Sequence, residues 1–371
     1  MTSLSVVWAD PTRALAFSRW LNAIARQFPL QIDTLRLASA DASFRRYLRI
    51  DTAFTAAMGT PKSYIIMDAP PAQEDCKPFV KVADLMREAG VSAPSVLAWD
   101  EAEGFMLLSD MGTHTMLDVL LDTTVPLCAL DTVGQPSTAQ HDLYIDAVDA
   151  LIGWQLSSKP GVLPLYDDAL LSRELALFPD WYVAQHRGMA VDSTMAGKLD
   201  DMFAHIKASN LESLGGARVF VHRDFMPRNL MVSEQVTQRL SVLDFQDAVY
   251  GPITYDIASL MRDAFLSWEE DFVLDITVRY WQKARKAGLP VGDDFGEFYR
   301  AVEWMGLQRH LKVLGIFARL TLRDSKPKYL ADTPRFIKYA RNTAARYRQL
   351  GPLMVLLDHI EGNETRVGYT F

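Results

Sequence analysis

The stretch FVHRDFMPRNLMV, Phe220 to Val232, holds a histidine, two arginines, an aspartate and an asparagine between two apolar runs. Asp224 follows the first run, which is strand-like, and Asn229 closes the loop after it. A further strand-like run, LSVLDF, carries Asp244 near its end. If the strands before Asp224 and Asp244 are neighbours, three oxygen-bearing side chains converge at one end of a small sheet.

This set of side chains is suited to phosphoryl transfer. Aspartate and asparagine oxygens are the hard ligands that Mg²⁺ prefers, and they leave coordination positions for phosphate oxygens. A carboxylate that does not bind the metal can orient a hydroxyl group and accept its proton. The order H-R-D-x-x-x-x-N is that of a kinase catalytic loop, in which Asp224 is the base and Asn229 binds the metal.

Two other interpretations of these residues compete with this one. In the first, Asp224 caps a turn, Asn229 takes a left-handed backbone position and Asp244 pairs with an arginine. The second is a hydrolytic metal centre, which needs several closely spaced histidines. The seven histidines of this chain are scattered, without an HxxxH pair. The ordered set of loop residues therefore favours phosphoryl transfer.

The composition is that of an ordinary soluble globular protein of 371 residues, with 49% hydrophobic and 23% charged residues. This length indicates one large domain or two ordinary ones. A net charge of −8 argues against a nucleic-acid partner. The two cysteines, Cys76 and Cys128, form no CxxC motif, which is typical of a reducing compartment. We find no signal peptide and no apolar run of about 18 residues, so we expect a cytoplasmic protein without a membrane partner.

Two different patterns divide the chain. Asp10 and Pro11 predict the start of a helix, and helix 78–90 is predicted to end at a glycine. Four short strands are predicted in the same part, at 46–50, 63–69, 95–100 and 104–110. Helical patterns dominate after Gly112. We therefore predict an α+β fold with a small β-rich lobe, 1–110, preceded by a helix, and a larger helical lobe, 111–371.

The stretches VHRDFMPRNLM and VLDFQDAVYGPITYDIASLMRD resemble the aminoglycoside phosphotransferase family of small-molecule kinases. The resemblance implies a two-lobed, protein-kinase-like fold and the use of ATP and Mg²⁺. It implies that Asp224 is catalytic and that Asn229 and Asp244 are the Mg²⁺ ligands. Asp256, in YDIA, resembles the structural aspartate that steadies the catalytic loop. We expect His222 and Arg223 to support the same loop.

Further stretches resemble the anomeric sugar kinases of cell-wall recycling within this family. They are DASFRRYLRI (41–50), MDAPPAQED (67–75), LFPDWYVAQHRG (177–188) and QRHLKVLGIFARLTLRDSKPKYL (308–330). The resemblance implies phosphorylation of N-acetylmuramic acid or N-acetylglucosamine at the anomeric hydroxyl, in peptidoglycan recycling. We expect a monomer that binds a small-molecule sugar.

The predicted nucleotide site departs from the protein-kinase pattern. The turn SADASFRRY lacks the glycines of the phosphate loop, and Met67 stands where the third-strand lysine is expected. The helix that supplies the glutamate partner of this lysine has Phe79 or Val80 near that point. Loss of both partners is coherent, because a lone buried charge is costly. Arg46 or Arg49 are the candidates to neutralise the phosphates instead.

Other residues are predicted to complete the nucleotide site. Ser43 and Arg45 lie in the same turn as Arg46 and are candidates for phosphate contacts. The alternative is that these arginines are solvated residues at a strand edge. The stretch FMLLSDMG resembles the hinge between lobes, where Met106 and Leu108 line an adenine pocket. The alternative for FMLLSDMG is an ordinary buried strand.

The predicted helix around 304–320 carries two stripes. Its core-facing seam is Trp304, Leu307, Leu311, Leu314 and Ala318, and its polar stripe contains Gln308, Lys312, Gly315 and Arg319. Gly315 indicates that a side chain at this position would clash with a neighbour. We predict that Gln308, Arg309 and Lys312 bind the acceptor, together with Asp247 and Tyr250. The alternative is a solvated helix face.

The charge of this region bears on the choice of acceptor. It is basic, with Arg323, Lys326, Lys328 and Arg335 following the helix. An aminoglycoside is a polycation and needs carboxylates, whereas a sugar with a carboxylate suits arginine or lysine. Two alternatives stay open: a kinase of the same fold for an aminoglycoside, an amino alcohol or another sugar, and a non-catalytic nucleotide-binding module.

Overall fold

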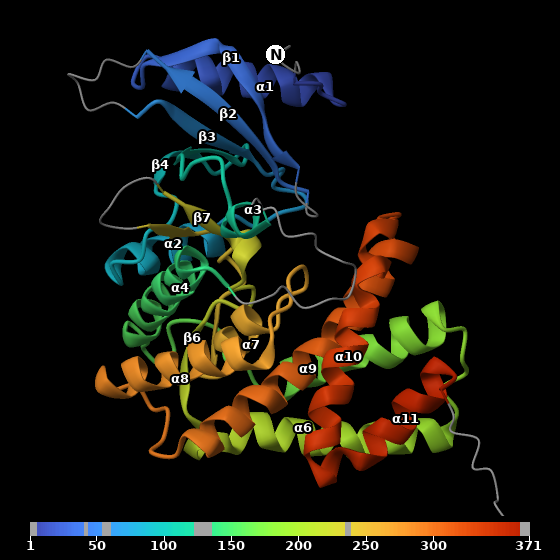
Figure 1. Cartoon of the computed structure of the whole chain (residues 1–371). Coiled ribbons are helices and arrows are strands. Elements are labelled where there is room, and N and C mark those ends of the chain that lie inside the picture. Colours follow the sequence, from blue (N-terminus) through green and yellow to red (C-terminus); the bar gives the residue numbers. More distant parts are fainter. Residues whose placement is uncertain (1–5, 41–43, 54–60, 122–135, 234–238, 364–371) are drawn as a thin grey trace, which may run out of the picture. The chain divides into compact units, whose positions relative to one another are not determined.

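The computed structural model describes residues 6–40, 44–53, 61–121, 136–233 and 239–363 (Figure 1). In this part of the chain no helix has the length and apolar character needed to cross a membrane. Of the two cysteines, Cys76 is buried as a free thiol, and Cys128 lies outside the described residues.

The chain forms two compact units, and each unit is built from two separate stretches of the sequence. The first unit consists of Met1–Thr115 and Leu230–Asp247, and the second of Met116–Asn229 and Ala248–Phe371. The predicted boundary at residue 110 lies close to the end of the first segment. The predicted lobes did not include the return of Leu230–Asp247 to the first unit.

A five-stranded antiparallel sheet organises the first unit, with the strand order β1-β2-β3-β5-β4. The strands are β1 (Leu30–Ala40), β2 (Arg46–Thr52), β3 (Ser63–Asp68), β4 (Val96–Asp100) and β5 (Phe105–Ser109). Four of them confirm the predicted strands. The prediction missed β1, because this edge strand has two register irregularities toward β2 and exposes Ile32 and Leu37, which obscures the alternation of apolar residues.

Helix α1 (Pro11–Ile24) covers one face of this sheet. The side chain of Asp10 accepts a hydrogen bond from the backbone of Thr12 at 2.8 Å, which confirms the predicted start. Its apolar residues, including Phe17 and Trp20, share a buried cluster with alternate residues of β2, β3 and β5. The residues between them therefore point to the opposite face of the sheet.

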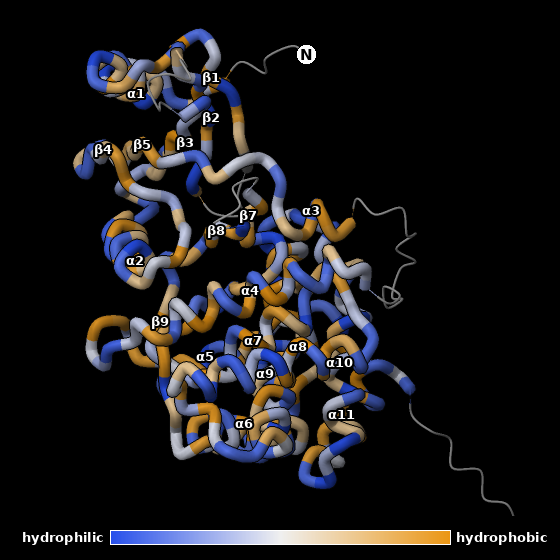
Figure 2. Tube along the Cα trace, turned by 60° about the vertical axis from the view of Figure 1, so that its left-hand side comes forward, coloured by the Kyte–Doolittle hydropathy of each residue, from blue (hydrophilic) through white to orange (hydrophobic). Residues whose placement is uncertain are grey.

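Helix α2 (Lys77–Glu88) and a hairpin complete the first unit. The helix is followed by Gly90 at φ 70°, as predicted, and hydrophilic and hydrophobic residues alternate along its trace (Figure 2). The hairpin pairs β7 (Leu230–Val232) with β8 (Leu240–Val242). Phe79 of α2 packs on Phe245, with ring centroids 4.8 Å apart. This contact fixes the segment after β8, which carries Asp244.

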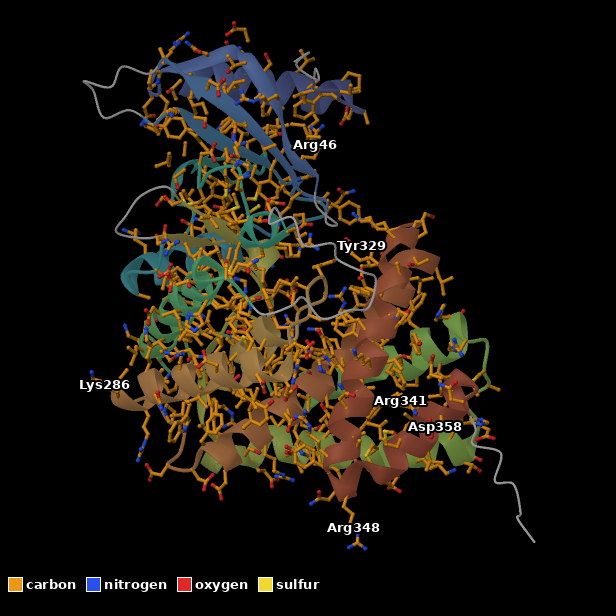
Figure 3. The ribbon with its side chains drawn as sticks, viewed as in Figure 1. Arg46, Lys286, Tyr329, Arg341, Arg348 and Asp358 are labelled. Carbon is orange, nitrogen blue, oxygen red and sulfur yellow. The ribbon has the colours of Figure 1, made fainter. Side chains whose placement is uncertain are left out.

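The second unit is mainly helical, so the two units together confirm the predicted α+β class. Its helices in the described residues are α3 (Met116–Leu121), α4 (Thr138–Leu156), α5 (Asp168–Leu177), α6 (Ser193–Gly216), α7 (Tyr255–Met261), α8 (Glu270–Lys286), α9 (Phe295–Leu322), α10 (Thr333–Arg346) and α11 (Gly351–Glu361). A π-helix, η2 (Phe178–His186), continues α5, and short 3₁₀ helices lie at η3 (Pro227–Asn229), η4 (Pro327–Asp332) and η5 (Arg348–Leu350). Arg341 of α10 donates to Asp358 of α11 and ties the last two helices together (Figure 3).

Helix α9 is the central helix of this unit. All five residues of the predicted core-facing seam are buried. The expectation for Gly315 is also confirmed, because a Cβ atom there would lie 2.2 Å from the backbone oxygen of Leu177. A glycine is thus required where α9 passes the junction of α5 and η2.

A second antiparallel pair, β6 (Arg218–Val221) and β9 (Val249–Pro252), precedes and follows the catalytic-loop sequence. The condition for the convergence of the three oxygen-bearing side chains, that the strands before Asp224 and Asp244 are neighbours in one sheet, is not met. Strand β6 pairs with β9, and β8 pairs with β7, so they belong to two separate two-stranded sheets. The reason is that LDFQDAVYG contains a turn and a new strand after Asp244, which returns the chain to β6.

Candidate active site

The buried carboxylate of Asp256, in the first turn of α7, binds the backbone of the loop after β6. Its two oxygens accept hydrogen bonds from the backbone N–H groups of His222 at 2.7 Å and Arg223 at 3.0 Å. Burial raises the pKa of Asp256, and the two backbone donors and the nearby His222 and Arg309 side chains oppose this shift. The two bonds fix the backbone just before Asp224.

Side chains within the loop complete this support. The ring nitrogen Nδ1 of the buried His222 accepts a hydrogen bond from the backbone N–H of Asp224 at 3.2 Å. Asn229, in η3, donates from Nδ2 to the backbone oxygen of Asp224 at 2.9 Å. The second unit thus brings His222, Asp224 and Asn229 together in one hydrogen-bonded turn, with the Asp224 residue half-buried.

Arg223 turns away from this loop toward the interior. Its backbone is left-handed, at φ 78°, which is uncommon for an arginine. Its guanidinium Nη2 donates to Oε1 of Glu174 on α5 at 2.6 Å. Its backbone oxygen accepts a hydrogen bond from Nη1 of Arg309 at 2.7 Å. The left-handed conformation of Arg223 is therefore stabilised by one contact of its side chain and one of its backbone oxygen.

Glu174 is the centre of a buried network. Besides Arg223, it contacts Lys312 Nζ at 2.9 Å, Gln308 Nε2 at 2.9 Å and the hydroxyl of Tyr166 at 2.7 Å. Burial alone raises the pKa of Glu174, but the charges of Lys312 and Arg223 outweigh it and hold the pKa well below its usual range. The carboxylate is therefore ionised and fully partnered.

The residues of α9 that were predicted to bind the acceptor belong to this network. Gln308, Arg309 and Lys312 are all buried. Lys312 also donates to the hydroxyl of Tyr255 at 3.0 Å, and the Arg309 guanidinium lies over the Tyr255 ring at 4.8 Å. The polar stripe is therefore not a solvated face. Its contact with the acceptor stays a prediction. In this structure Gln308 and Lys312 donate to Glu174, and Arg309 donates to the loop backbone at Arg223 O.

The other predicted residues after the loop lie in different places. Asp244 belongs to the first unit, has a left-handed backbone at φ 61°, and accepts a hydrogen bond from the Gln246 side chain at 2.8 Å. Asp247 is exposed. Tyr250 belongs to β9 in the second unit, where its backbone N–H donates to Pro164 O at 2.7 Å. Acceptor contacts of Asp247 and Tyr250 stay predictions.

The predicted phosphate-binding arginines are all paired with carboxylates inside the first unit. Arg46 shares Asp68 with Arg13, each at 2.6 Å (Arg46 is labelled in Figure 3). Arg49 binds Asp110 at 2.6 Å, and Arg45 binds Glu74 at 3.0 Å. Ser43 lies outside the described residues.

Because side chains alternate along a strand, Arg46 and Arg49 lie on opposite faces of the sheet. Arg46 lies opposite Asp68, in register with the residues that pack on α1. Arg49 lies opposite Ile65, on the face that also carries Met67. Of the two candidates to replace the missing lysine, only Arg49 therefore shares a face with Met67, and its contact with phosphate stays a prediction.

The same face carries the residues of the predicted adenine pocket. Met67 lies opposite Met106 in the ladder of β3 and β5, and Ile65 lies opposite Leu108. Phe105 and Leu107 belong instead to the cluster under α1. Met106 and Leu108 are buried on the face away from α1, which is compatible with their predicted role and leaves that role a prediction.

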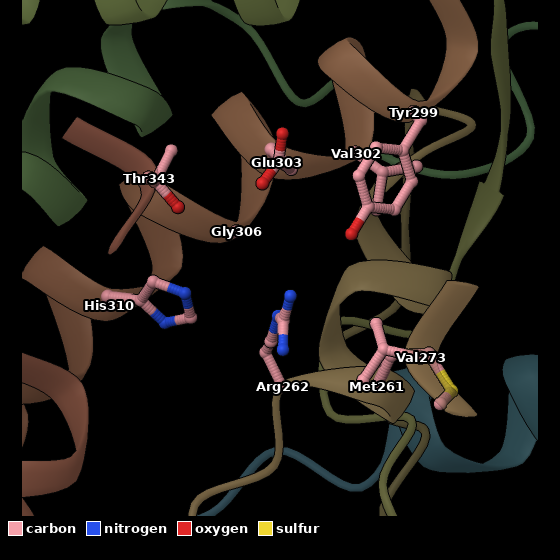
Figure 4. A pocket seen from close by; sticks show the side chains of 9 residues that line it. All are labelled: Met261, Arg262, Val273, Tyr299, Val302, Glu303, Gly306, His310 and Thr343. Carbon is pink, nitrogen blue, oxygen red and sulfur yellow. The ribbon is translucent and has the colours of Figure 1, made fainter. Parts of the chain in front are cut away.

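A small cavity in the second unit is lined by polar side chains of three helices. Arg262, Tyr299, Glu303 and His310 point toward it (Figure 4). Its volume is about 10 Å³, which is the space of a single water molecule. It therefore cannot hold a sugar or a nucleotide.

Sequence reasoning missed the carboxylates that pair with the predicted cations. Glu174, Asp68 and Asp110 each bind arginines that the sequence had singled out. A signal for Glu174 was present, because it lies on the apolar face of its helix with Leu171, Leu175 and Phe178. An acidic residue on an apolar face predicts a buried partner of opposite charge.

Comparison with known proteins agrees with this geometry. The chain matches the phosphotransferase enzyme family over residues 34–295. It is 49% identical to an N-acetylmuramate/N-acetylglucosamine kinase of Pseudomonas aeruginosa, over 86% of each chain. It is 43% identical to a protein of the same name from Neisseria meningitidis serogroup B, over 97% of this chain and 99% of that one.

A solved structure shows the same fold at low sequence identity. A choline kinase from Cryptosporidium parvum covers 92% of this chain and 99% of its own, with a TM-score of 0.58 at 12% identity. This likeness confirms the predicted protein-kinase-like fold. With the family match over more than half of its residues, the chain belongs to the phosphotransferase enzyme family.

Proposed function

We propose that this protein is a cytoplasmic, ATP-dependent kinase that phosphorylates N-acetylmuramic acid and N-acetylglucosamine at the anomeric hydroxyl, in peptidoglycan recycling. The observation that carries the proposal is the catalytic loop, whose backbone before Asp224 is held by Asp256 at 2.7 and 3.0 Å. The names of the two relatives, at 49% and 43% identity, support this choice of sugars.

In this proposal Asp224 orients the acceptor hydroxyl and accepts its proton. Catalysis of phosphoryl transfer depends mainly on positioning and on charge stabilisation. The hydrogen bonds of His222 and Asn229 to the backbone of Asp224 hold this residue in a defined position. Arg223 and Arg309 secure the same loop from the interior.

Asn229 and Asp244 would hold Mg²⁺. Their side chains are suited to this ion, since a carboxylate and an amide supply the oxygen ligands that Mg²⁺ prefers. The Asn229 amide nitrogen donates to Asp224 O, so its oxygen is the atom that it offers to a metal. Bound Mg²⁺ would neutralise charge on the phosphates of ATP. The left-handed backbone of Asp244 and its bond with Gln246 fix the second ligand.

Arg49 is the residue that we assign to the phosphates in place of the missing lysine. It is on the same face of the sheet as Met67, and its guanidinium is held by Asp110 at 2.6 Å. Met106 and Leu108 would line the adenine site. Met67 is buried and carries no charge, so its position needs no glutamate counter-charge from α2.

The test is ATP consumption by the purified protein with N-acetylmuramic acid, N-acetylglucosamine, glucose and kanamycin, each with Mg²⁺ and with EDTA. We expect turnover of the two N-acetyl sugars, an acid-labile phosphate in the product, and no turnover with EDTA. Turnover of kanamycin alone would contradict the proposed acceptor. No turnover of any acceptor would favour a nucleotide-binding module instead.

Substitution of the proposed base provides the second part of this test. Asp224→Asn should lower kcat by at least about 100-fold, because it removes the general base, while ATP binding stays close to that of the wild type. Near-normal turnover in this variant would overturn the assignment of Asp224.

A further inference from the structure

The loop between α7 and α8 holds a buried carboxylate that the proposed mechanism does not use. Asp263 is 2% exposed, and its Oδ1 accepts the backbone N–H of Ala264 at 2.6 Å. Its Oδ2 is buried and accepts no hydrogen bond from any residue that the structure describes. A buried carboxylate oxygen without a donor is costly and needs an explanation, such as a catalytic role or a bound water or ion. Burial raises the pKa of Asp263 to about 6, and the backbone N–H groups of Ala264 and Phe265 oppose this shift.

Arg335, at the start of α10, supplies an unsatisfied donor to the same cluster. Its Nη1 donates to Ser267 Oγ at 3.2 Å, and its Nη2 lies 3.6 Å from Asp332, which is longer than a hydrogen bond. Its Nε is buried and has no acceptor among the described residues. The side chain is only 13% exposed, so water cannot replace these partners freely.

Arg228 connects the cluster to the catalytic loop. It is exposed, lies in η3 directly before Asn229, and forms no ion pair with any residue that the structure describes. Its guanidinium lies 5.1 Å from the ring centroid of Phe265, two residues after Asp263. The charges of Arg335 and Arg228 both lower the pKa of Asp263, so both lie within electrostatic range of that carboxylate.

We propose that Asp263, Arg335 and Arg228 form the subsite that recognises the acceptor sugar and selects for an acidic one. Asp263 Oδ2 accepts a hydrogen bond from a sugar hydroxyl, and Arg228 and Arg335 bind the carboxylate of N-acetylmuramic acid. The subsite has a donor, an acceptor and a spare positive charge, which are the groups that a hydroxylated monoanion requires. This inference rests on the proposed function and adds residues that bind the acceptor.

The experiment compares kcat/KM for N-acetylmuramic acid and N-acetylglucosamine in the full-length protein with Mg²⁺ and ATP. Arg228→Gln is the main variant, because an exposed side chain can be replaced without loss of folding. We expect kcat/KM for N-acetylmuramic acid to fall by about 10- to 100-fold, since a hydrogen bond to a charged group is lost. The value for N-acetylglucosamine, which has no carboxylate, should change by less than about threefold.

Asp263→Asn tests the hydroxyl contact. We expect KM to rise for both sugars, because both offer hydroxyls, while KM for ATP stays unchanged. Arg335→Gln should again affect N-acetylmuramic acid more than N-acetylglucosamine. The matched controls are Arg285→Gln and Asp293→Asn, which alter an exposed ion pair on the surface and should leave both values unchanged.

The two hypotheses fail in different ways. If the wild type uses neither sugar, the proposed function fails and the subsite fails with it. If the wild type uses both sugars and Arg228→Gln lowers them equally or not at all, only the subsite is overturned. An unchanged sugar KM in Asp263→Asn would likewise assign Asp263 a structural role alone.

Discussion

Two buried carboxylates of the second unit, Glu174 and Asp263, show opposite environments. Glu174 has four partners, two of them cations, and its pKa lies well below the usual range. One oxygen of Asp263 has no hydrogen-bond donor in the described part of the chain, and burial raises the pKa of Asp263 to about 6. The comparison suggests that the first carboxylate serves the fold and that the second is kept for a ligand.

The largest effect on stability is expected at Glu174. Glu174→Gln removes the charge that the half-buried Arg223 and the buried Lys312 share, which should cost about 3–5 kcal/mol of unfolding free energy. Urea denaturation measures this. Asp149→Asn removes one charge of an exposed ion pair with Lys283 and should cost less than about 1 kcal/mol. Similar losses of unfolding free energy in both variants would show that the Glu174 network stabilises the fold no more than an exposed ion pair does.

The second prediction tests whether a change near Glu174 leaves the proposed Asp263 subsite unaffected. Gly315→Ala places a Cβ 2.2 Å from Leu177 O, so α9 must move away from α5, which carries Glu174. We expect a loss of about 1–3 kcal/mol and a lower kcat, with the preference between the two sugars unchanged. Gly197→Ala, at an open helical position, is the control and should stabilise by about 0.5–1 kcal/mol. A changed preference between the two sugars in Gly315→Ala would contradict the view that the Glu174 network and the Asp263 subsite have separate roles.

The elements that sequence predicted well depend on neighbours along the chain. The start of α1 at Asp10, the end of α2 at Gly90 and the buried seam of α9 follow from capping and periodicity. Gly315 was also recognised, because a glycine inside a helix has a cost that needs a reason.

What could not be predicted depends on residues far apart in the sequence. The periodicity of α9 shows that Lys312 lies on a polar stripe, but not that Glu174 of α5 packs against it. The pairing of β6 with β9 likewise follows from the return of the chain after Asp244. For the candidate site, the loop residues were found from their spacing, whereas Asp263 was missed because its surroundings come from three separate segments.

The third effect should have the opposite sign from that at Glu174. At pH 8, Asp263→Asn removes a buried charge whose desolvation outweighs the donors and cations around it. The raised pKa corresponds to a cost of up to about 3 kcal/mol, of which we expect about 1 kcal/mol to be recovered, since a buried amide also needs partners. Chemical denaturation of the two proteins at pH 8 gives the difference. Destabilisation by more than about 1 kcal/mol would mean that Asp263 supports the fold as Glu174 does.

The smallest effect is a difference in pH dependence. Folded Asp263 keeps its proton up to a pKa of about 6, whereas the unfolded chain loses it near 3.8. The folded state therefore binds more protons in this window, so the Asp263 contribution to stability falls as pH rises from about 4 to 6. For Glu174 the folded pKa is lowered from 4.5, so its contribution is present above 4.5 and is lost as pH falls below that value.

The difference in unfolding free energy between wild type and Asp263→Asn should thus decrease with rising pH and level off above about 6. A flat difference across this window would show that the Asp263 carboxylate has found donors in solution, and the contrast with Glu174 would then disappear.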